Sequence, residues 1–123
     1  MSFYLFLAAA IICLLSVYVH GVWGRGLYAG FIKDSNLPDR EKGVSLVSWD
    51  VFTVMLAVSG LVLIYVAFNP ETLLMVYPIM LMQLGGAVVF FYLTFSQHKS
   101  LSRLPGGVLM GSTGGMVLLG LYL

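Results

Sequence analysis

The sequence contains very few charged side chains for its length. Asp, Glu, Lys and Arg make up only 9% of its 123 residues, whereas 60% are hydrophobic and the mean hydropathy is +1.00. A soluble domain carries about 25% charged residues, and a domain this small exposes much of its surface. So few charges cannot cover that surface. The composition therefore predicts a single-domain integral membrane protein, residues 1–123, with lipid as its main solvent.

Cysteine and histidine are also scarce. Cys13 is the only cysteine, which excludes an intramolecular disulfide and a CxxC redox or metal motif. Because it lies in an apolar run, we interpret Cys13 as a buried packing residue. His98 falls about 39 Å along its helix, outside the hydrocarbon core, so it cannot share a buried metal with His20. We predict no metal and no cofactor, with a haem on His20 alone left open.

Motifs for catalysis and for nucleic-acid binding are missing. The net charge is +1, and the basic residues are divided between two loops, so no nucleic-acid partner is expected. The G-x-G at Gly24–Gly26 follows an apolar helix and lacks GKS or GKT, which argues against a phosphate loop. No carboxylate pair suits acid–base hydrolysis. We therefore predict no catalytic residue and expect that the protein is not an enzyme.

Long apolar runs, in contrast, are abundant. A hydrocarbon core of roughly 30 Å requires about 20 helical residues. Four runs reach or approach this length, and the expected spans are about 3–23, 44–68, 72–95 and 106–123. The first lacks a basic n-region and a cleavage site, so we expect it to be retained. The predicted fold is an all-α bundle of four transmembrane helices.

The basic residues predict the orientation of this bundle. The connection between the first two spans contains four of them and the connection between the last two contains the others: Arg25, Lys33, Arg40, Lys42, Lys99 and Arg103. The two termini and the turn at 69–71 contain none. The positive-inside rule places both basic connections in the cytoplasm and both termini outside. A bacterial inner membrane is the expected location.

Turn-forming residues predict the helix ends. Ser35 or Asn36 is expected to cap the second helix, which should begin near Pro38. Asn69 should end that helix, and Pro78 should kink the third one slightly. Short connections predict that the second and third helices, and the third and fourth, pack as antiparallel neighbours.

Three ionisable side chains are expected at the cytoplasmic edge of the bilayer. Measured from the outer helix ends at about 1.5 Å per residue, His20 lies roughly 26 Å and Asp50 roughly 27 Å along consecutive helices. Arg25 lies just beyond and can turn back toward Asp50. The cluster of His20, Arg25 and Asp50 is a candidate for proton handling or ligand binding. A structural ion pair, or a capping carboxylate, is the alternative interpretation.

Milder polar groups are expected near the bilayer midplane. Gln83 lies roughly 17 Å into its span, where an unpaired amide is costly. It is expected to bond to Ser59, Ser112, Thr113 or a backbone carbonyl. Such a bond would hold helices together, and a substrate contact is the alternative.

Glycines on the last two helices predict close packing. Gly107, Gly111 and Gly115 are four residues apart and share one face of the fourth helix. Gly85 and Gly86 supply a matching surface on the third helix. The partner of the fourth helix is either this third helix or a second copy of the chain.

The first half of the chain resembles a group of small four-helix bacterial inner-membrane proteins without an assigned activity. The resemblance rests on His20, Gly24, Leu37-Pro38 and Trp49-Asp50, and it implies a four-helix fold. That group often has histidine at the position of Asp50. The length is also similar to that of the small multidrug resistance transporters, but these depend on a glutamate in helix one, and this chain has no acid there.

Three functions follow as hypotheses. The first is a structural or accessory subunit that self-associates or joins a larger membrane complex, because the chain has little charge for chemistry within the bilayer. The second is a small proton-coupled transporter that uses Asp50 and His20. The third is a haem- or quinone-binding redox subunit.

Overall fold

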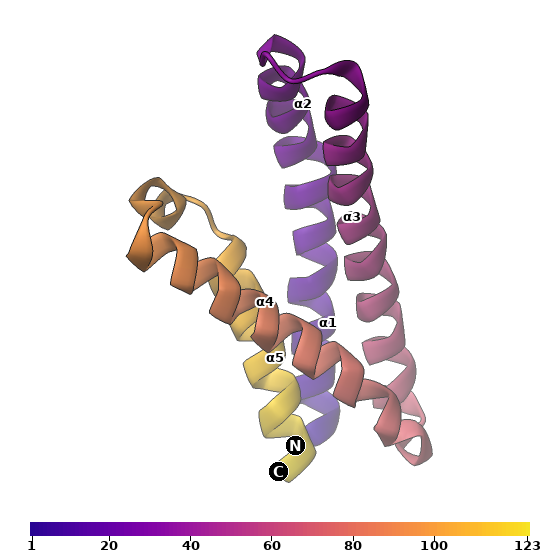
Figure 1. Ribbon diagram of the computed structural model, residues 1–123. Helices are drawn as coiled ribbons and strands as arrows, with labels where there is room; N and C mark the ends of the chain where they lie inside the picture. Colours follow the sequence, from indigo (N-terminus) through magenta and orange to yellow (C-terminus); the bar gives the residue numbers. More distant parts are fainter.

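The computed structural model describes residues 1–123 as helices joined by short connections, without strands (Figure 1). The prediction of an all-α protein is therefore confirmed. Three continuous helical runs are long and apolar enough to cross a membrane, and a shorter apolar helix follows them. In chain order the elements are α1 (Ser2–Tyr18), η1 (Val19–Gly24), α2 (Arg25–Asp34), α3 (Asp39–Phe68), η2 (Pro70–Met75), α4 (Val76–Ser96), η3 (Lys99–Arg103) and α5 (Gly106–Tyr122).

The first helical run is longer than predicted. It does not end near residue 23 but continues through η1, a π-helical segment, into α2, and ends at Asp34. Glycine costs only about 1 kcal/mol in a helix interior, so tertiary contacts can keep a glycine-containing segment helical. At about 1.5 Å per residue, the 33 residues of this run extend roughly 50 Å. The run therefore exceeds a hydrocarbon core of roughly 30 Å.

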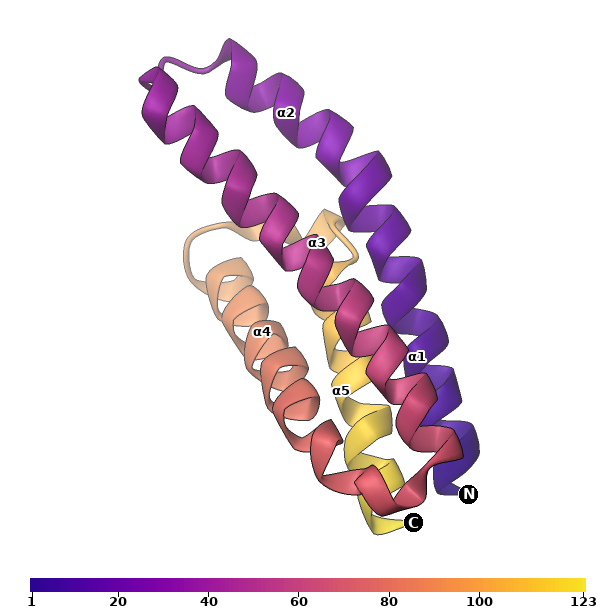
Figure 2. The ribbon, with the colours of Figure 1, turned by 90° about the vertical axis from the view of Figure 1, so that its right-hand side faces the viewer.

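The helices pair differently from the expected order. α1 packs against α3 and α5, and α4 packs against α5, whereas α3 and α4 make few contacts although they are consecutive. Figure 2 shows α5 between α4 and α1. The prediction that the second and third helices are close neighbours is wrong. The 3₁₀ segment η2, with Thr72 at φ −95° and ψ 18°, redirects the chain between them.

The helix ends agree with the sequence only in part. α3 begins directly after Pro38, as expected, but neither Ser35 nor Asn36 caps it. The Ser35 hydroxyl instead donates to the carbonyl of Ile32 at the end of α2. Pro78 lies in the first turn of α4, where a missing N–H costs no helical hydrogen bond. The irregular backbone lies earlier, in η2.

The hydrophobic core is concentrated at the end of the molecule that holds both termini. Small side chains of α1 let α3 and α5 approach it closely. The core comprises Phe6, Ala9, Ala10, Leu63, Val66, Ala67, Val76, Ile79 and Val117. Away from this core, α4 and α5 diverge from α1 and α3 (Figure 1).

The buried polar groups are satisfied by bonds that the sequence did not predict. Gln83 donates to the Cys13 sulfur at 3.8 Å, and the Cys13 thiol donates to the Leu56 carbonyl at 3.2 Å. The Ser59 and Thr113 hydroxyls bond to carbonyls four residues earlier on their own helices. The expected bond between Gln83 and these hydroxyls, or Ser112, is therefore wrong. Cys13 is fully buried, as predicted.

Several glycines allow α4 and α5 to approach each other. A methyl group at Gly107 would lie 2.8 Å from the Phe90 ring, and one at Gly114 would lie 2.7 Å from Leu84. Gly86 similarly accommodates Met110, whereas Gly111 has only an ordinary contact, with the Ala87 side chain at 3.8 Å. The expected close packing between α4 and α5 is therefore present.

Two of the predicted packing glycines have no such role within the chain. A methyl group at Gly85 or at Gly115 would meet no atom within 4 Å. Helix geometry explains why these two glycines lack contacts. Gly85 comes directly after the contact residue Leu84, and Gly115 directly after the contact residue Gly114, so each is rotated by about 100° around the helix axis from a residue that faces the other helix. The intrachain packing prediction is wrong for Gly85 and Gly115.

Candidate functional site

The candidate site is centred on η1, where two glycines face side chains of α3. A methyl group at Gly21 would lie 2.5 Å from Thr53 Cγ2, and one at Gly24 would lie 3.2 Å from the Trp49 ring. A methyl group at Gly21 would overlap Thr53, and one at Gly24 would require the Trp49 ring to shift by a few tenths of an ångström. Short π-helical segments inside α-helices are frequent at functional sites. The histidine between the two glycines is thereby positioned against α3.

Two hydrogen bonds attach His20 to α3. The Trp49 indole N–H donates to the His20 carbonyl at 2.8 Å, and His20 Nδ1 lies 2.7 Å from Thr53 Oγ1. Thr53 Oγ1 also donates to the Trp49 carbonyl at 3.2 Å, so its oxygen accepts from the imidazole. With the Thr53 hydrogen donated to the Trp49 carbonyl, a neutral imidazole has its proton on Nδ1 and a lone pair on Nε2. No group of the protein bonds to Nε2.

An aromatic stack reinforces this arrangement. Trp49 lies between His20, with ring centroids 4.1 Å apart, and Tyr28, with centroids 4.3 Å apart. Both pairs are nearly parallel, with interplanar angles of 11° and 15°. Phe52 meets the other side of His20 edge-on at 5.1 Å. The imidazole is therefore fixed by ring contacts as well as by hydrogen bonds.

The predicted ionic cluster is only partly assembled. Arg25 turns back to Asp50 and donates two hydrogen bonds to its carboxylate, at 2.7 and 3.2 Å. This bidentate pair joins α2 to α3 and remains partly exposed. His20, however, bonds to Thr53 and not to Asp50. The structure thus shows the ion pair of the alternative interpretation, with the histidine in a separate network.

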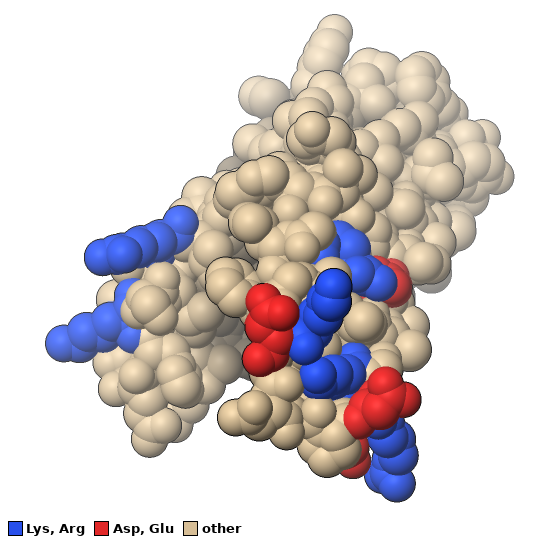
Figure 3. Space-filling model, turned by 90° about the horizontal axis from the view of Figure 1, so that it is seen from above, with Lys and Arg blue, Asp and Glu red and all other residues tan.

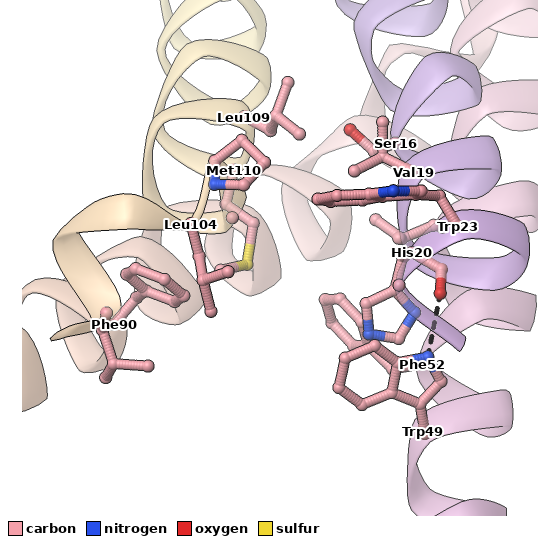
Figure 4. Close-up of a pocket in the computed structure, with 15 residues that line it drawn as sticks. Ser16, Val19, His20, Trp23, Trp49, Phe52, Phe90, Leu104, Leu109 and Met110 are labelled. Atoms are coloured by element: carbon pink, nitrogen blue, oxygen red, sulfur yellow. Dashed lines mark hydrogen bonds between the residues drawn. The ribbon is translucent and has the colours of Figure 1, made fainter. Parts of the chain in front are cut away.

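A pocket of about 320 Å³ adjoins the imidazole (Figure 4). Trp23, Trp49 and Phe52 line one side of it together with His20. Side chains of α4, η3 and α5 line the opposite side, among them Phe90, Leu101, Leu104, Leu109 and Met110. The lining is mostly hydrophobic and aromatic, which is typical of sites for small apolar ligands.

The sequence analysis missed several residues of this site. Thr53 and Tyr28 were not distinguished from other helical residues, because a threonine hydroxyl in a helix ordinarily bonds to its own backbone. Trp49 comes next to Asp50, at a level where tryptophan is common in membrane proteins, so its position alone did not predict a contact with His20. The spacing of Trp49 and Thr53, four residues apart on one face, is the signal that could have placed both against His20. Phe90 becomes a neighbour only through the tertiary fold.

Metal chemistry finds no support in the arrangement of side chains. Nowhere do three His, Cys, Asp or Glu side chains come together in a group that could hold a metal ion. His20 remains a lone imidazole with one free nitrogen. The contacts that the site makes are hydrogen bonds and aromatic stacking.

No protein-family model, curated protein or solved structure matches the chain. The resemblance to small four-helix bacterial membrane proteins stays a prediction. The functional interpretation therefore depends on the geometry of this chain alone.

Proposed function

We propose that this protein is a small multi-pass membrane protein that acts as an accessory subunit and associates with a second copy of itself. The observation that carries the proposal is the open position of Gly85 and Gly115 on the outer face of α4 and α5. We define the outer α4–α5 face as the surface centred on these two glycines.

The helical register places both glycines away from the bundle. Gln83 and Thr113, one residue before the contact residues Leu84 and Gly114, are buried. Gln83 contacts Cys13 of α1, so this side faces the bundle. Gly115 follows the contact residue Gly114, and Gly85 lies between the contact residues Leu84 and Gly86, on the side of α4 that faces away from α5. Neither glycine therefore faces α1.

Large apolar side chains surround this small central area. Leu81 and Val88 on α4, and Val108 and Leu119 on α5, are all exposed. In lipid, hydrophobicity does not drive helices together, and close backbone approach at small residues is a main source of association. A notch at the glycines, flanked by larger side chains, suits a two-fold contact with the same surface of another copy.

The charge distribution supports insertion with both basic connections in the cytoplasm. All six Lys and Arg residues lie in α2, the first turns of α3 and η3. Figure 3, which views that end of the molecule, shows their side chains gathered there. The termini and η2 lie at the opposite end (Figure 1). The positive-inside rule then favours external termini, and a bacterial inner membrane fits this arrangement.

Replacing Gly115 with leucine tests the proposal. A Cβ at this position meets no atom of its own chain within 4 Å, and the rest of the leucine side chain would obstruct the close approach of a second copy. We expect the dimerisation constant to fall at least about tenfold, a loss of about 1.4 kcal/mol, as measured from the dimer and monomer populations in native mass spectrometry in mild detergent. Gly30→Leu, also at an open glycine but on α2, is the matched control. A monomeric native protein, or a Gly115→Leu dimer as abundant as the control, would contradict the proposal.

The proton-coupled transporter hypothesis has less support from the geometry. Asp50 is held by Arg25 near the end of the molecule that carries the basic residues. Ser59 and Thr113 bond to carbonyls of their own helices and Gln83 bonds to Cys13, so these buried polar side chains do not continue the His20 network. We therefore favour the accessory-subunit function over the transporter function.

A further inference from the structure

The pocket beside His20 offers a ligand two polar groups that have no partner in the protein, His20 Nε2 and the indole N–H of Trp23. Nδ1 of the imidazole is engaged by Thr53, whose hydroxyl donates to the Trp49 carbonyl. Nε2 of the neutral ring is then a hydrogen-bond acceptor without a partner in the protein. A ligand that donates an O–H hydrogen complements this atom, whereas one that offers only a carbonyl oxygen does not.

The remainder of the pocket suits a flat, apolar molecule. Its volume of about 320 Å³ is at the lower end of the range for small-molecule sites. Indole and phenyl rings from Trp23, Trp49, Phe52 and Phe90 form much of its surface. Figure 4 shows Phe90 facing the pocket across from His20. Aromatic rings on both sides favour a ring-shaped ligand over a flexible chain.

The position of the pocket along the helices indicates where such a ligand would come from. His20 lies about 26 Å from the start of the first helical run, near one edge of a hydrocarbon core of roughly 30 Å. Farther into the bundle, the pocket continues along Leu56 and Leu109. A molecule with a polar ring and an apolar tail would have its ring at the membrane edge and its tail among apolar side chains.

We propose that this pocket binds a lipid-soluble hydroquinone, with one ring hydroxyl donating a hydrogen bond to His20 Nε2. The proposal concerns binding alone and is independent of self-association. The hydroquinone should bind more tightly than the corresponding quinone, because only the hydroquinone can donate a hydrogen bond to Nε2.

Intrinsic fluorescence tests this directly, because both tryptophans of the chain line the pocket. The full-length protein, in phosphatidylcholine nanodiscs without oxygen, is titrated with a short-chain hydroquinone and separately with its dimethyl ether. We expect saturable quenching by the hydroquinone and about five- to tenfold weaker binding of the ether, which lacks the donated hydrogen bond. Linear quenching by both compounds, as from partition into lipid, would overturn the proposal.

Two variants identify the contact. In His20→Phe the ring stack on Trp49 is kept but Nε2 is lost, so the preference for hydroquinone over its ether should disappear. His98→Phe, at the exposed second histidine, should retain the full preference. A preference that persists in His20→Phe would contradict the proposal. Should His20→Phe fail to fold, the ¹⁵Nε2 resonance of His20 in the native protein must shift with the hydroquinone and not with the ether.

Discussion

Trp49 makes contacts at the candidate site that no other residue reproduces. Its two ring faces contact His20 and Tyr28, and its N–H bonds to the His20 carbonyl. A tryptophan at a membrane interface ordinarily keeps its N–H for headgroups or water. Here that group bonds α3 to η1. Trp49 therefore holds α3 to the first helical run at a level beyond the hydrophobic core, where small core side chains no longer join the two.

Trp49→Phe is expected to lower the free energy of unfolding by about 1 kcal/mol. The phenyl ring keeps part of the stack but cannot donate to the His20 carbonyl. Unfolding by sodium dodecyl sulfate in mixed micelles, followed by far-ultraviolet circular dichroism, measures the difference. Trp23→Phe is the matched control, since Trp23 is 54% exposed and makes no hydrogen bond through its indole. Equal stability of both variants would contradict this role for Trp49.

At the same scale, the sequence predicted the pair of Arg25 and Asp50 but not the bonds of His20. The helical rise per residue is enough to predict that Arg25 and Asp50 lie at a similar depth along their helices. Opposite charges at a similar depth on neighbouring helices are expected to form an ion pair. His20 and Thr53 are a different case, because their contact depends on how closely α3 approaches η1. That distance is set by Gly21 and Gly24, whose role becomes visible only in the tertiary structure.

At the scale of elements, η1 connects a bundle helix with an extension beyond it. Its glycines suggested a helix end, yet helical structure continues to Asp34. The apolar runs were predicted well because their length and composition reflect the solvent directly. The pairing of α3 with α4 was predicted poorly, because a short connection fixes sequence order but not the angle at which the chain leaves η2.

Gly21→Ala should destabilise the association of η1 with α3. The added methyl group would lie 2.5 Å from Thr53 Cγ2, and relief of that overlap should cost about 1–3 kcal/mol. The same unfolding titration measures this change. Gly26→Ala is the control, because a methyl group there meets nothing within 4 Å and alanine favours helix by up to about 1 kcal/mol. Destabilisation of Gly26→Ala to the same extent would show that helix continuity, and not the approach of α3, explains the effect.

For the whole molecule, the two ends differ in composition and in packing. One end contains the compact core, both termini and η2, and the other contains the basic residues and the pocket. The outer α4–α5 face extends between these ends, and a Cβ at Gly85 or Gly115 on it would meet no atom within 4 Å. Self-association through that face is the central claim for the whole molecule.

Cysteine cross-linking tests that claim most directly. In a two-fold dimer packed at the notch, residue 115 lies next to its own copy, so Gly115→Cys in native membranes should form a disulfide-linked dimer under mild oxidation. The native Cys13 is fully buried and should not react. Ser100→Cys, exposed in η3, serves as the control for random collision. We expect rapid, saturating cross-linking at position 115 and little at position 100. Equal or slower cross-linking at position 115 would contradict it.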